Sequence, residues 1–377
     1  MMLPELLYNA KATLGEGPAW DAKAQLLYWI DILEKRVYAD GKPIIQLEDY
    51  VGCVAPRKGG GLILAQRFGF WTFDPATAKL VTYASPKGEP SNNRFNDGKC
   101  DSHGRFVAGT MDHSEQETSG SLYSLSVDGR IKKLLKEVRI SNGIAWSPDS
   151  KTMYFIDTPT REVKAFDYDI ETGQIANPRV IITFPDTFGF PDGMTSDMNG
   201  NLWIAMWGGA RVTQWSPKGV LLEQFGVPAL NITSCVFGGP DMNELFITSA
   251  RVGMDAAALK KYPQAGGVFQ LITNVTGMPT FEFGGLRNYI YNESTRCSSR
   301  PRTIARRHAR LDFRRDGGYR CSRKRTTWHD SQLVYIGFAR TTAHHHFTAR
   351  FHTHTRSGLS RPGFWCDHPG REPTIDL

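Results

Sequence analysis

One short phrase recurs six times along the first two thirds of the chain. Each copy is a run of β-branched or aromatic residues, and a turn-forming residue stands at or near its start in most copies. The six phrases are QLLYWID (25–31), GGLILAQ (60–66), GRFVAGT (104–110), KTMYFID (151–157), NLWIAMW (201–207) and NELFITS (243–249). Successive copies are 36, 43, 47, 49 and 43 residues apart, measured between Tyr28, Leu64, Val107, Tyr154, Trp203 and Phe246. A period near 44 residues is typical of a four-stranded propeller blade.

Further strands are expected between the phrases, for example at FGFWTFD (68–74), VKAFDYD (163–169) and RVTQWSP (211–217). Only DAAALKKYP (255–263) looks like a short helix. A pair of β-sandwiches would not need so even a spacing. The sequence therefore predicts an all-β chain with a six-bladed β-propeller, in which LLYNAKA (6–12) supplies the strand that closes the ring.

The composition changes abruptly near Gly285. The last 93 residues hold 18 Lys and Arg, of which 17 are Arg, against 7 Asp and Glu, and eight of the ten histidines. Three explanations compete: a nucleic-acid-binding arm, a His-rich metal-binding tract, and an extension that arises from a shifted reading frame or a retained intron. We favour the third, and predict a propeller domain over 1–285 and a disordered, dispensable tail over 286–377.

The remaining 284 residues carry 27 basic and 31 acidic side chains, so the net charge of +7 belongs to the tail. Without a basic patch in the body we expect no nucleic-acid partner. No apolar run is long enough to cross a membrane, and the N-terminus does not resemble a signal peptide. We therefore expect a cytoplasmic protein with free thiols, monomeric or weakly dimeric, and no membrane association.

Four segments combine acids or amides with glycine: LGEGPAWD (14–21), NRFNDGKCD (93–101), ISNGIAWSPD (140–149) and FPDGMTSDMNGN (190–201). We interpret them as loops that lead into strands, because they hold many polar groups. Glu16, Asn142 and Asp192 each precede a glycine, which lets the backbone approach an ion closely. Two carboxylates and an amide oxygen suit Ca²⁺, Mg²⁺ or Mn²⁺ and, less exclusively, Zn²⁺. The alternative for any one of them is an ordinary turn residue.

These segments, in order, resemble the senescence-marker/regucalcin/gluconolactonase family of sugar lactonases. The resemblance covers residues 14 to 284, and NRFNDGK, ISNG and PDGM are its most specific motifs. It implies a six-bladed propeller with one divalent metal ion (Ca, Zn, Mn or Mg) in the central channel. By matching motifs, Glu16, Asn142 and Asp192 fall on the metal-ligand positions.

The same resemblance places Arg94 and Asn96 on substrate-contacting positions. Arg94 would donate a planar fork to substrate oxygens, and Asn96 would contact a hydroxyl or the lactone oxygen. The family also uses an acidic residue after GTM, where the loop offers both Glu115 and Glu117, and we favour Glu115. Asp192 would in addition take a proton from the attacking water.

The function that follows is the metal-dependent hydrolysis of a sugar lactone such as gluconolactone. A calcium-binding regulator without dedicated catalysis, a non-catalytic scaffold and phosphoester hydrolysis as a side activity remain alternatives. A Ser-His-Asp triad has no support, because the body contains no G-x-S-x-G motif. We expect DYDIETGQ (167–174) and RKGGGL (57–62) to be hairpin turns, and His103 and His113 to occupy surface turns.

Overall fold

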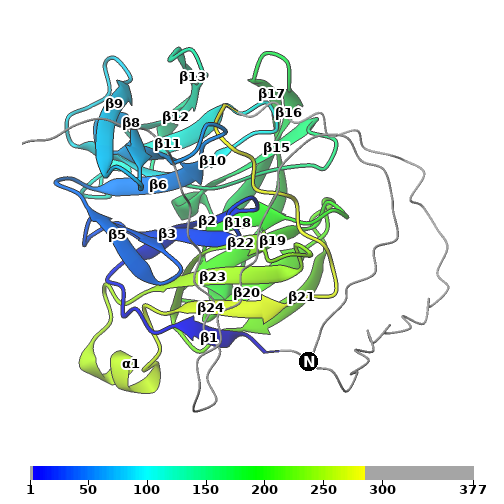
Figure 1. The fold of residues 1–377 in the computed structure, drawn as a ribbon. Helices are drawn as coiled ribbons and strands as arrows, with labels where there is room; N and C mark the ends of the chain where they lie inside the picture. Colours follow the sequence, from blue (N-terminus) through cyan, green and yellow to red (C-terminus); the bar gives the residue numbers. More distant parts are fainter. Residues whose placement is uncertain (1–2, 285–377) are drawn as a thin grey trace, which may run out of the picture. The chain divides into compact units, whose positions relative to one another are not determined.

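The six recurring phrases become the second strand of six four-stranded antiparallel sheets (Figure 1). The computed structural model describes residues 3–284, and the prediction for 286–377 lies outside this range. The first three sheets are β2–β5, β6–β9 and β10–β13, and the next two are β14–β17 and β18–β21. The sixth sheet combines β22–β24 with the N-terminal strand β1. The predicted six-bladed β-propeller is confirmed.

The strands of the first three sheets have the following bounds: β2 (Gly15–Asp21), β3 (Leu26–Asp31), β4 (Arg36–Ala39), β5 (Lys42–Gln46), β6 (Val51–Pro56), β7 (Leu62–Gln66), β8 (Gly69–Asp74), β9 (Lys79–Ala84), β10 (Asn93–Cys100), β11 (Phe106–Asp112), β12 (Gly120–Leu125) and β13 (Ile131–Val138). Those of the other three are β14 (Ser141–Trp146), β15 (Thr152–Asp157), β16 (Glu162–Asp169), β17 (Gln174–Thr183), β18 (Phe190–Ser196), β19 (Leu202–Trp207), β20 (Arg211–Trp215), β21 (Leu221–Gly226), β22 (Asn231–Gly238), β23 (Glu244–Ala250), β24 (Val268–Ile272) and β1 (Glu5–Tyr8).

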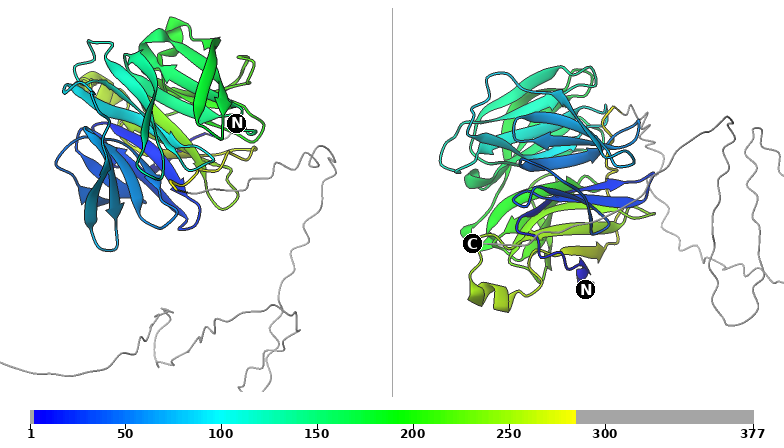
Figure 2. Two further views of the ribbon diagram at one scale, coloured as in Figure 1. Left: turned by 90° about the horizontal axis from the view of Figure 1, so that it is seen from above. Right: turned by 60° about the vertical axis from the view of Figure 1, so that its left-hand side comes forward.

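The helices are short and peripheral. α1 (Ala256–Lys261) lies in the predicted DAAALKKYP segment and projects at the edge of the propeller (Figures 1 and 2). The 3₁₀ turns η1 (Thr158–Thr160) and η2 (Asp186–Phe188) lie in loops. Within residues 3–284 no helix has the length and apolar character to span a membrane.

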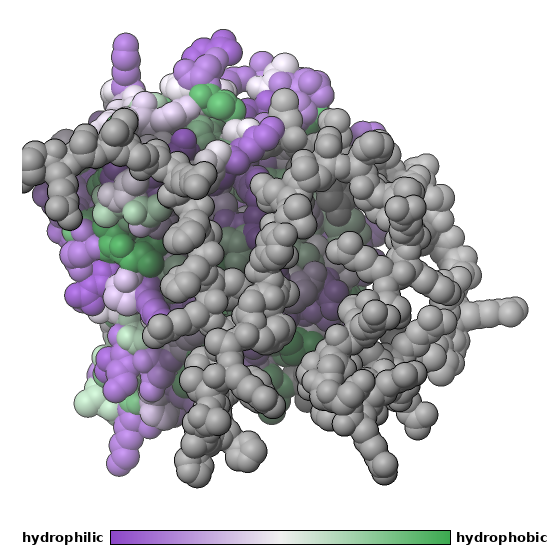
Figure 3. Space-filling model, in the orientation of Figure 1, coloured by the Kyte–Doolittle hydropathy of each residue, from purple (hydrophilic) through white to green (hydrophobic). Residues whose placement is uncertain are grey.

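The first strand of each sheet contacts the first strand of the next, from β2 through β6, β10, β14 and β18 to β22 and back to β2. β1 pairs with β24, with Glu5 opposite Gln270, so the N-terminal strand completes the last sheet as predicted. The outermost strands are half exposed, and the upper edge in Figure 3, where Figure 1 places β9, β13 and β17, is largely hydrophilic.

The four polar segments that we interpreted as loops are themselves the innermost strands β2, β10, β14 and β18, so that interpretation was wrong. These strands are almost completely buried from end to end. An innermost strand is enclosed by its own sheet and by the neighbouring strands of the ring. Its polar residues therefore serve an interior site rather than a surface loop.

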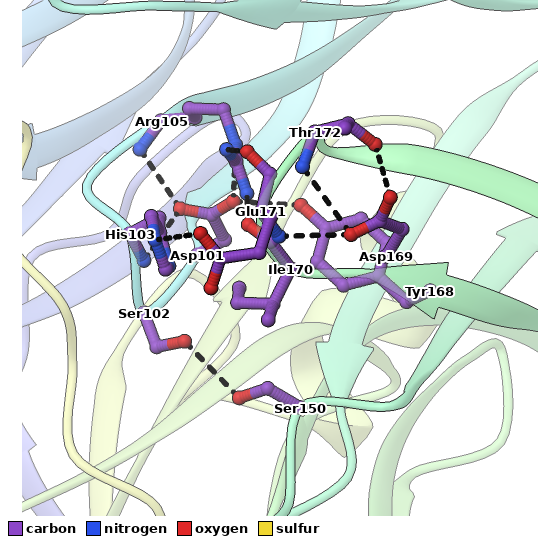
Figure 4. Close-up of polar contacts among 10 residues, drawn as sticks. All are labelled: Asp101, Ser102, His103, Arg105, Ser150, Tyr168, Asp169, Ile170, Glu171 and Thr172. Carbon is purple, nitrogen blue, oxygen red and sulfur yellow. Dashed lines mark hydrogen bonds and ion pairs between the residues drawn. The ribbon is translucent and has the colours of Figure 1, made fainter.

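A buried polar cluster joins the third and fourth sheets (Figure 4). The Asp101 carboxylate accepts hydrogen bonds from the backbone N–H of Arg105 at 2.8 Å, from Arg105 Nε at 2.7 Å and from the Tyr168 hydroxyl at 2.6 Å. Arg105 then donates to the carbonyls of Ile170 and Glu171 in the β16–β17 turn. That turn is the predicted DYDIETGQ hairpin, and His103 lies in the adjacent turn, as expected.

Gly52 marks a place where two inner strands touch. A Cβ at this position would lie 2.4 Å from the carbonyl of Phe95 on β10. We expect Gly52→Ala to lower the free energy of unfolding by about 1–3 kcal/mol, the usual cost of overpacking a core. Gly59→Ala is the matched control, since nothing lies within 4 Å of its added Cβ. Urea denaturation of both variants tests this, and equal midpoints would contradict the close packing of β6 on β10.

Candidate active site

A pocket of about 450 Å³ opens at the N-terminal ends of the innermost strands. Its lining includes all six residues assigned from the sequence: Glu16, Arg94, Asn96, Glu115, Asn142 and Asp192. Glu117, the alternative to Glu115, is not among the lining residues. His113, expected in a surface turn, is exposed in a turn and also lines the pocket. Four sheets thus bring sequence-distant polar groups to one place.

Every innermost strand carries a register shift at the same level of the ring. The shift falls between Glu16 and Ala19 on β2, between Asn142 and Ile144 on β14, and between Pro191 and Met194 on β18. β6, β10 and β22 are interrupted in the same way. Bulges re-aim side chains and are frequent beside active sites. Here they lie beside Glu16, Asn142 and Asp192, and the following glycines permit the local conformation.

Two buried oxygens at the floor of the pocket have no hydrogen-bond partner. They are Asn142 Oδ1 and Asp192 Oδ1. The other side-chain atom of Asn142 fixes its orientation, because Nδ2 donates a hydrogen bond to Thr158 Oγ1 at 2.9 Å. Thr158 Oγ1 in turn donates to the Pro191 carbonyl at 2.9 Å. Buried polar atoms are nearly always bonded, so two free acceptors in one pocket indicate a missing donor or cation.

The floor also concentrates negative charge. Burial, followed by the neighbouring Asp97 carboxylate, raises the pKa of Glu16 to about 8. Burial and Glu16 raise the pKa of Asp192 well above its ordinary value. Burial likewise raises the pKa of Asp97, while Lys99 opposes that rise. Because like charges in a low-dielectric site repel, a cation bound between Glu16 and Asp192 would stabilise the ionised carboxylates.

The donor set fits a divalent cation. Glu16 and Asp192 supply carboxylate oxygens and Asn142 an amide oxygen, the hard ligands that Ca²⁺, Mg²⁺ and Mn²⁺ prefer. Across residues 3–284 there is no cluster of three or more His, Cys, Asp or Glu side chains placed to hold a metal ion. A site made here would therefore combine two carboxylates with an amide and leave further positions to water or substrate.

Arg94 and Asn96 form one unit on β10. Arg94 Nη1 donates to Asn96 Oδ1 at 2.7 Å, and Asn96 Nδ2 donates to the Ser141 carbonyl at 2.9 Å on the next sheet. Arg94 is 4% exposed, and its Nε has no partner. Asn96 thus holds Arg94 in place, and the Arg94 guanidinium lines the pocket. The second lone pair of Asn96 Oδ1 remains available as well.

The loop that carries His113 and Glu115 is fixed by Asp112. Its carboxylate accepts hydrogen bonds from the Ser114 hydroxyl, from the backbone N–H groups of Gln116 and Glu117, and from the Asn92 amide. The Ser114 hydrogen bond is the main cause that holds the pKa of Asp112 well below its usual range. An ionised, fully engaged Asp112 therefore presents Glu115 at the pocket mouth.

Sequence reasoning missed two features of this site. Asp97 lies in the β10 bulge beside Asn96, is 5% exposed, and acts electrostatically on Glu16 and Asp192. The position of Asp97 next to Asn96 in the sequence NDG could have indicated its role. However, neighbouring residues of a regular strand point to opposite faces, which predicts that the Asp97 side chain points away from the site. The apolar wall of the pocket, which includes Phe190 and Trp207, was missed as well, because its residues are far apart in the sequence.

Comparison with known proteins gives a family match over residues 14–251, to the SMP-30/Gluconolactonase/LRE-like region. Regucalcin of Danio rerio is 39% identical over 292 residues, which cover 74% of this chain and 98% of regucalcin. A putative sugar lactone lactonase of Bacillus subtilis, YvrE, is 36% identical over 283 residues, which cover 74% and 97% respectively.

Among solved structures, a calcium-binding protein, regucalcin, from Agrobacterium tumefaciens superposes with a TM-score of 0.71 at 29% sequence identity. The superposition covers 75% of this chain and 97% of that protein. The similarity therefore spans the six sheets described above.

Proposed function

The chain belongs to the SMP-30/Gluconolactonase/LRE-like family, and we propose that it hydrolyses sugar lactones with one divalent cation held by Glu16, Asn142 and Asp192. The observation that carries this proposal is the pair of free buried oxygens, on Asn142 and Asp192, in the pocket that Glu16 also lines. The Bacillus subtilis relative described as a putative sugar lactone lactonase supports the substrate class.

A bound divalent cation would supply Lewis-acid polarisation of the lactone carbonyl. Asp192, which lines the pocket, accepts the proton of the attacking water through its carboxylate. Arg94, held by Asn96, lines the pocket and donates a guanidinium N–H to a substrate oxygen. Glu115 at the mouth accepts a hydrogen bond from a substrate hydroxyl.

Calcium binding without dedicated catalysis is the second candidate, and the Agrobacterium regucalcin, described as a calcium-binding protein, favours it. Against it stand Arg94 and Glu115, which line the same pocket. A cation cannot ligate another cation, so a site for calcium alone has no use for the Arg94 guanidinium.

The test is hydrolysis of glucono-δ-lactone by the full chain with Ca²⁺, Mg²⁺, Mn²⁺ or Zn²⁺. Hydrolysis of a phosphate monoester is measured under the same conditions for comparison. We expect catalysed opening of the lactone with at least one of these ions, above the rate of the ion alone. Tight Ca²⁺ binding with no lactone opening under any ion would overturn the proposal in favour of the regulatory function.

Glu16→Gln removes one charge from the proposed cation set while keeping the side-chain shape. We expect metal affinity to fall by at least ~10–100-fold, which is the cost of losing a residue that only hydrogen-bonds to a metal ligand. The rate should be partly restored at high metal concentration. Calorimetric titration beside kinetics provides the measurement. Glu117→Gln, exposed and outside the pocket lining, is the control. A rate defect that excess metal leaves untouched would mean that Glu16 is not a ligand.

A further inference from the structure

The mouth of the pocket is divided into a polar and an apolar part by the order of the sheets. The third sheet contributes His113 and Glu115. Going onward around the ring, the fourth, fifth, sixth and first sheets contribute apolar side chains that line the pocket: Pro159, Phe190, Trp207, Val252, Leu14 and Leu33. These six side chains form an apolar arc over four consecutive sheets.

The centre of this arc is an aromatic pair. Phe190 begins β18 and lies directly opposite Trp207 at the end of β19. Phe190 is 40% exposed, although most large apolar side chains in residues 3–284 are buried, and it lines the pocket. An exposed apolar surface in a binding pocket indicates that the ligand carries an apolar group.

The apolar wall is held in place by its own contacts. The Arg161 guanidinium lies 3.9 Å from the centre of the Phe190 ring, and its Nη1 donates to the Gly189 carbonyl at 2.6 Å. Thr158, which precedes Pro159, is tied to β18 by its hydrogen bond to the Pro191 carbonyl. A wall that is ordered before binding loses little freedom when a ligand arrives.

A fully hydroxylated sugar lactone matches only part of this pocket. Its polar groups find Arg94, Asn96 and Glu115 on one side, but hydroxyls facing Phe190 and Pro159 would lose water and gain no partner. The Thr158 hydroxyl offers only one remaining lone pair, since it already accepts from Asn142 and donates to the Pro191 carbonyl. The volume of about 450 Å³ falls in the range that holds drug-sized ligands.

We propose that the substrate is a lactone with an apolar substituent, aryl or alkyl, that packs against Phe190, Trp207 and Pro159 while the ring ester faces Asp192. This inference rests on the proposed lactonase function and narrows its substrate class: a fully hydroxylated lactone such as glucono-δ-lactone would be a poorer substrate than a lactone that carries an apolar group. The chemistry is unchanged: water adds to the ester carbonyl, the ring C–O bond breaks, and the product is the hydroxy acid that carries the apolar group.

The kinetic test compares δ-valerolactone with derivatives that carry a phenyl or a pentyl group on the carbon next to the ring oxygen, and with glucono-δ-lactone. We expect kcat/KM to be at least about tenfold higher for the phenyl and pentyl lactones than for δ-valerolactone or glucono-δ-lactone. Even one methylene group in an apolar pocket changes kcat/KM by about 10-fold or more. Equal or lower values for these two lactones would overturn the inference while leaving the lactonase function intact.

Two variants locate the effect. Phe190→Ala should lower the ratio of kcat/KM for the phenyl lactone to kcat/KM for δ-valerolactone by about tenfold, and Trp207→Ala should lower this ratio similarly. Phe68→Ala is the matched control: Phe68 is also exposed, at 58%, and also has an arginine over its ring, at 4.8 Å, but it does not line the pocket. An unchanged ratio in both pocket variants would contradict the assignment.

A binding measurement separates this inference from the proposed function. The corresponding lactams keep the ring shape and resist hydrolysis, so calorimetry with the full chain and Ca²⁺ reports affinity alone. Tighter binding of the phenyl lactam than of δ-valerolactam, lost in Phe190→Ala, would support the apolar subsite even if no lactone were opened. No binding of either lactam would overturn the subsite.

Discussion

Asp192→Ala is expected to reduce lactone hydrolysis by at least the ~10²–10⁴-fold that loss of a general base costs. The substitution removes a proposed cation ligand and the proposed proton acceptor together. The fold should survive, because burial and Glu16 raise the pKa of Asp192, which means that its ionised carboxylate does not stabilise the folded protein without a cation. Steady-state kinetics at saturating metal, with thermal unfolding of the same samples, measures both effects.

Asp192→Asn distinguishes the two roles. The amide keeps an oxygen ligand but cannot accept the proton of water, so excess metal should restore occupancy and not the rate. Asp186→Ala is the control, since Asp186 lies in η2 just before β18 with a 92% exposed side chain, outside the pocket lining. Near-normal turnover by Asp192→Asn at high metal would show that Asp192 serves only as a ligand.

Asp101→Ala should have the largest effect on stability. The Asp101 side chain is fully buried and its partner Arg105 is 11% exposed, at an Nε–Oδ2 distance of 2.7 Å (Figure 4). Removing the carboxylate leaves the buried guanidinium and the Tyr168 hydroxyl without their acceptor. Breaking a buried pair in this way costs about 3–5 kcal/mol, and urea denaturation would measure the loss.

An exposed ion pair provides the comparison. Asp128 and Arg130 have the same kind of contact, 2.6 Å between Nε and Oδ2, but their side chains are 51% and 85% exposed. Asp128→Ala should therefore change the free energy of unfolding by less than about 1 kcal/mol. Similar losses in both aspartate variants would mean that the buried cluster does not hold the third and fourth sheets together.

The second strand of every sheet was predictable because it is apolar, short and evenly repeated. The outermost strands were not: β13, for example, reads IKKLLKEV on an exposed edge, without the strict apolar and polar alternation that indicates a strand. The innermost strands were misread as loops because their polar and glycine residues face a buried site. An apolar composition identifies buried strands only where the surrounding interior is apolar, and the innermost strands of this propeller surround a polar site.

The residues of the site were predicted better than its shape. Motif resemblance gave Glu16, Asn142 and Asp192, and the fold brings them to one pocket with Arg94. The hydrogen bond between Arg94 and Asn96 depends on the bulge that begins after Phe95, and a bulge has no reliable sequence signal. The aromatic pair of Phe190 and Trp207 depends on strand register in the same way.

The most direct test of the central claim is to strip the full chain of metal with a chelator and titrate a divalent ion back while lactone hydrolysis is followed. We expect the stripped protein to show no hydrolysis above background, and the rate to rise to a plateau at one ion per chain. Under the same titration Asp192→Ala should stay at background. Full activity in the chelated protein, or a rate that does not respond to any of the four ions, would contradict the account.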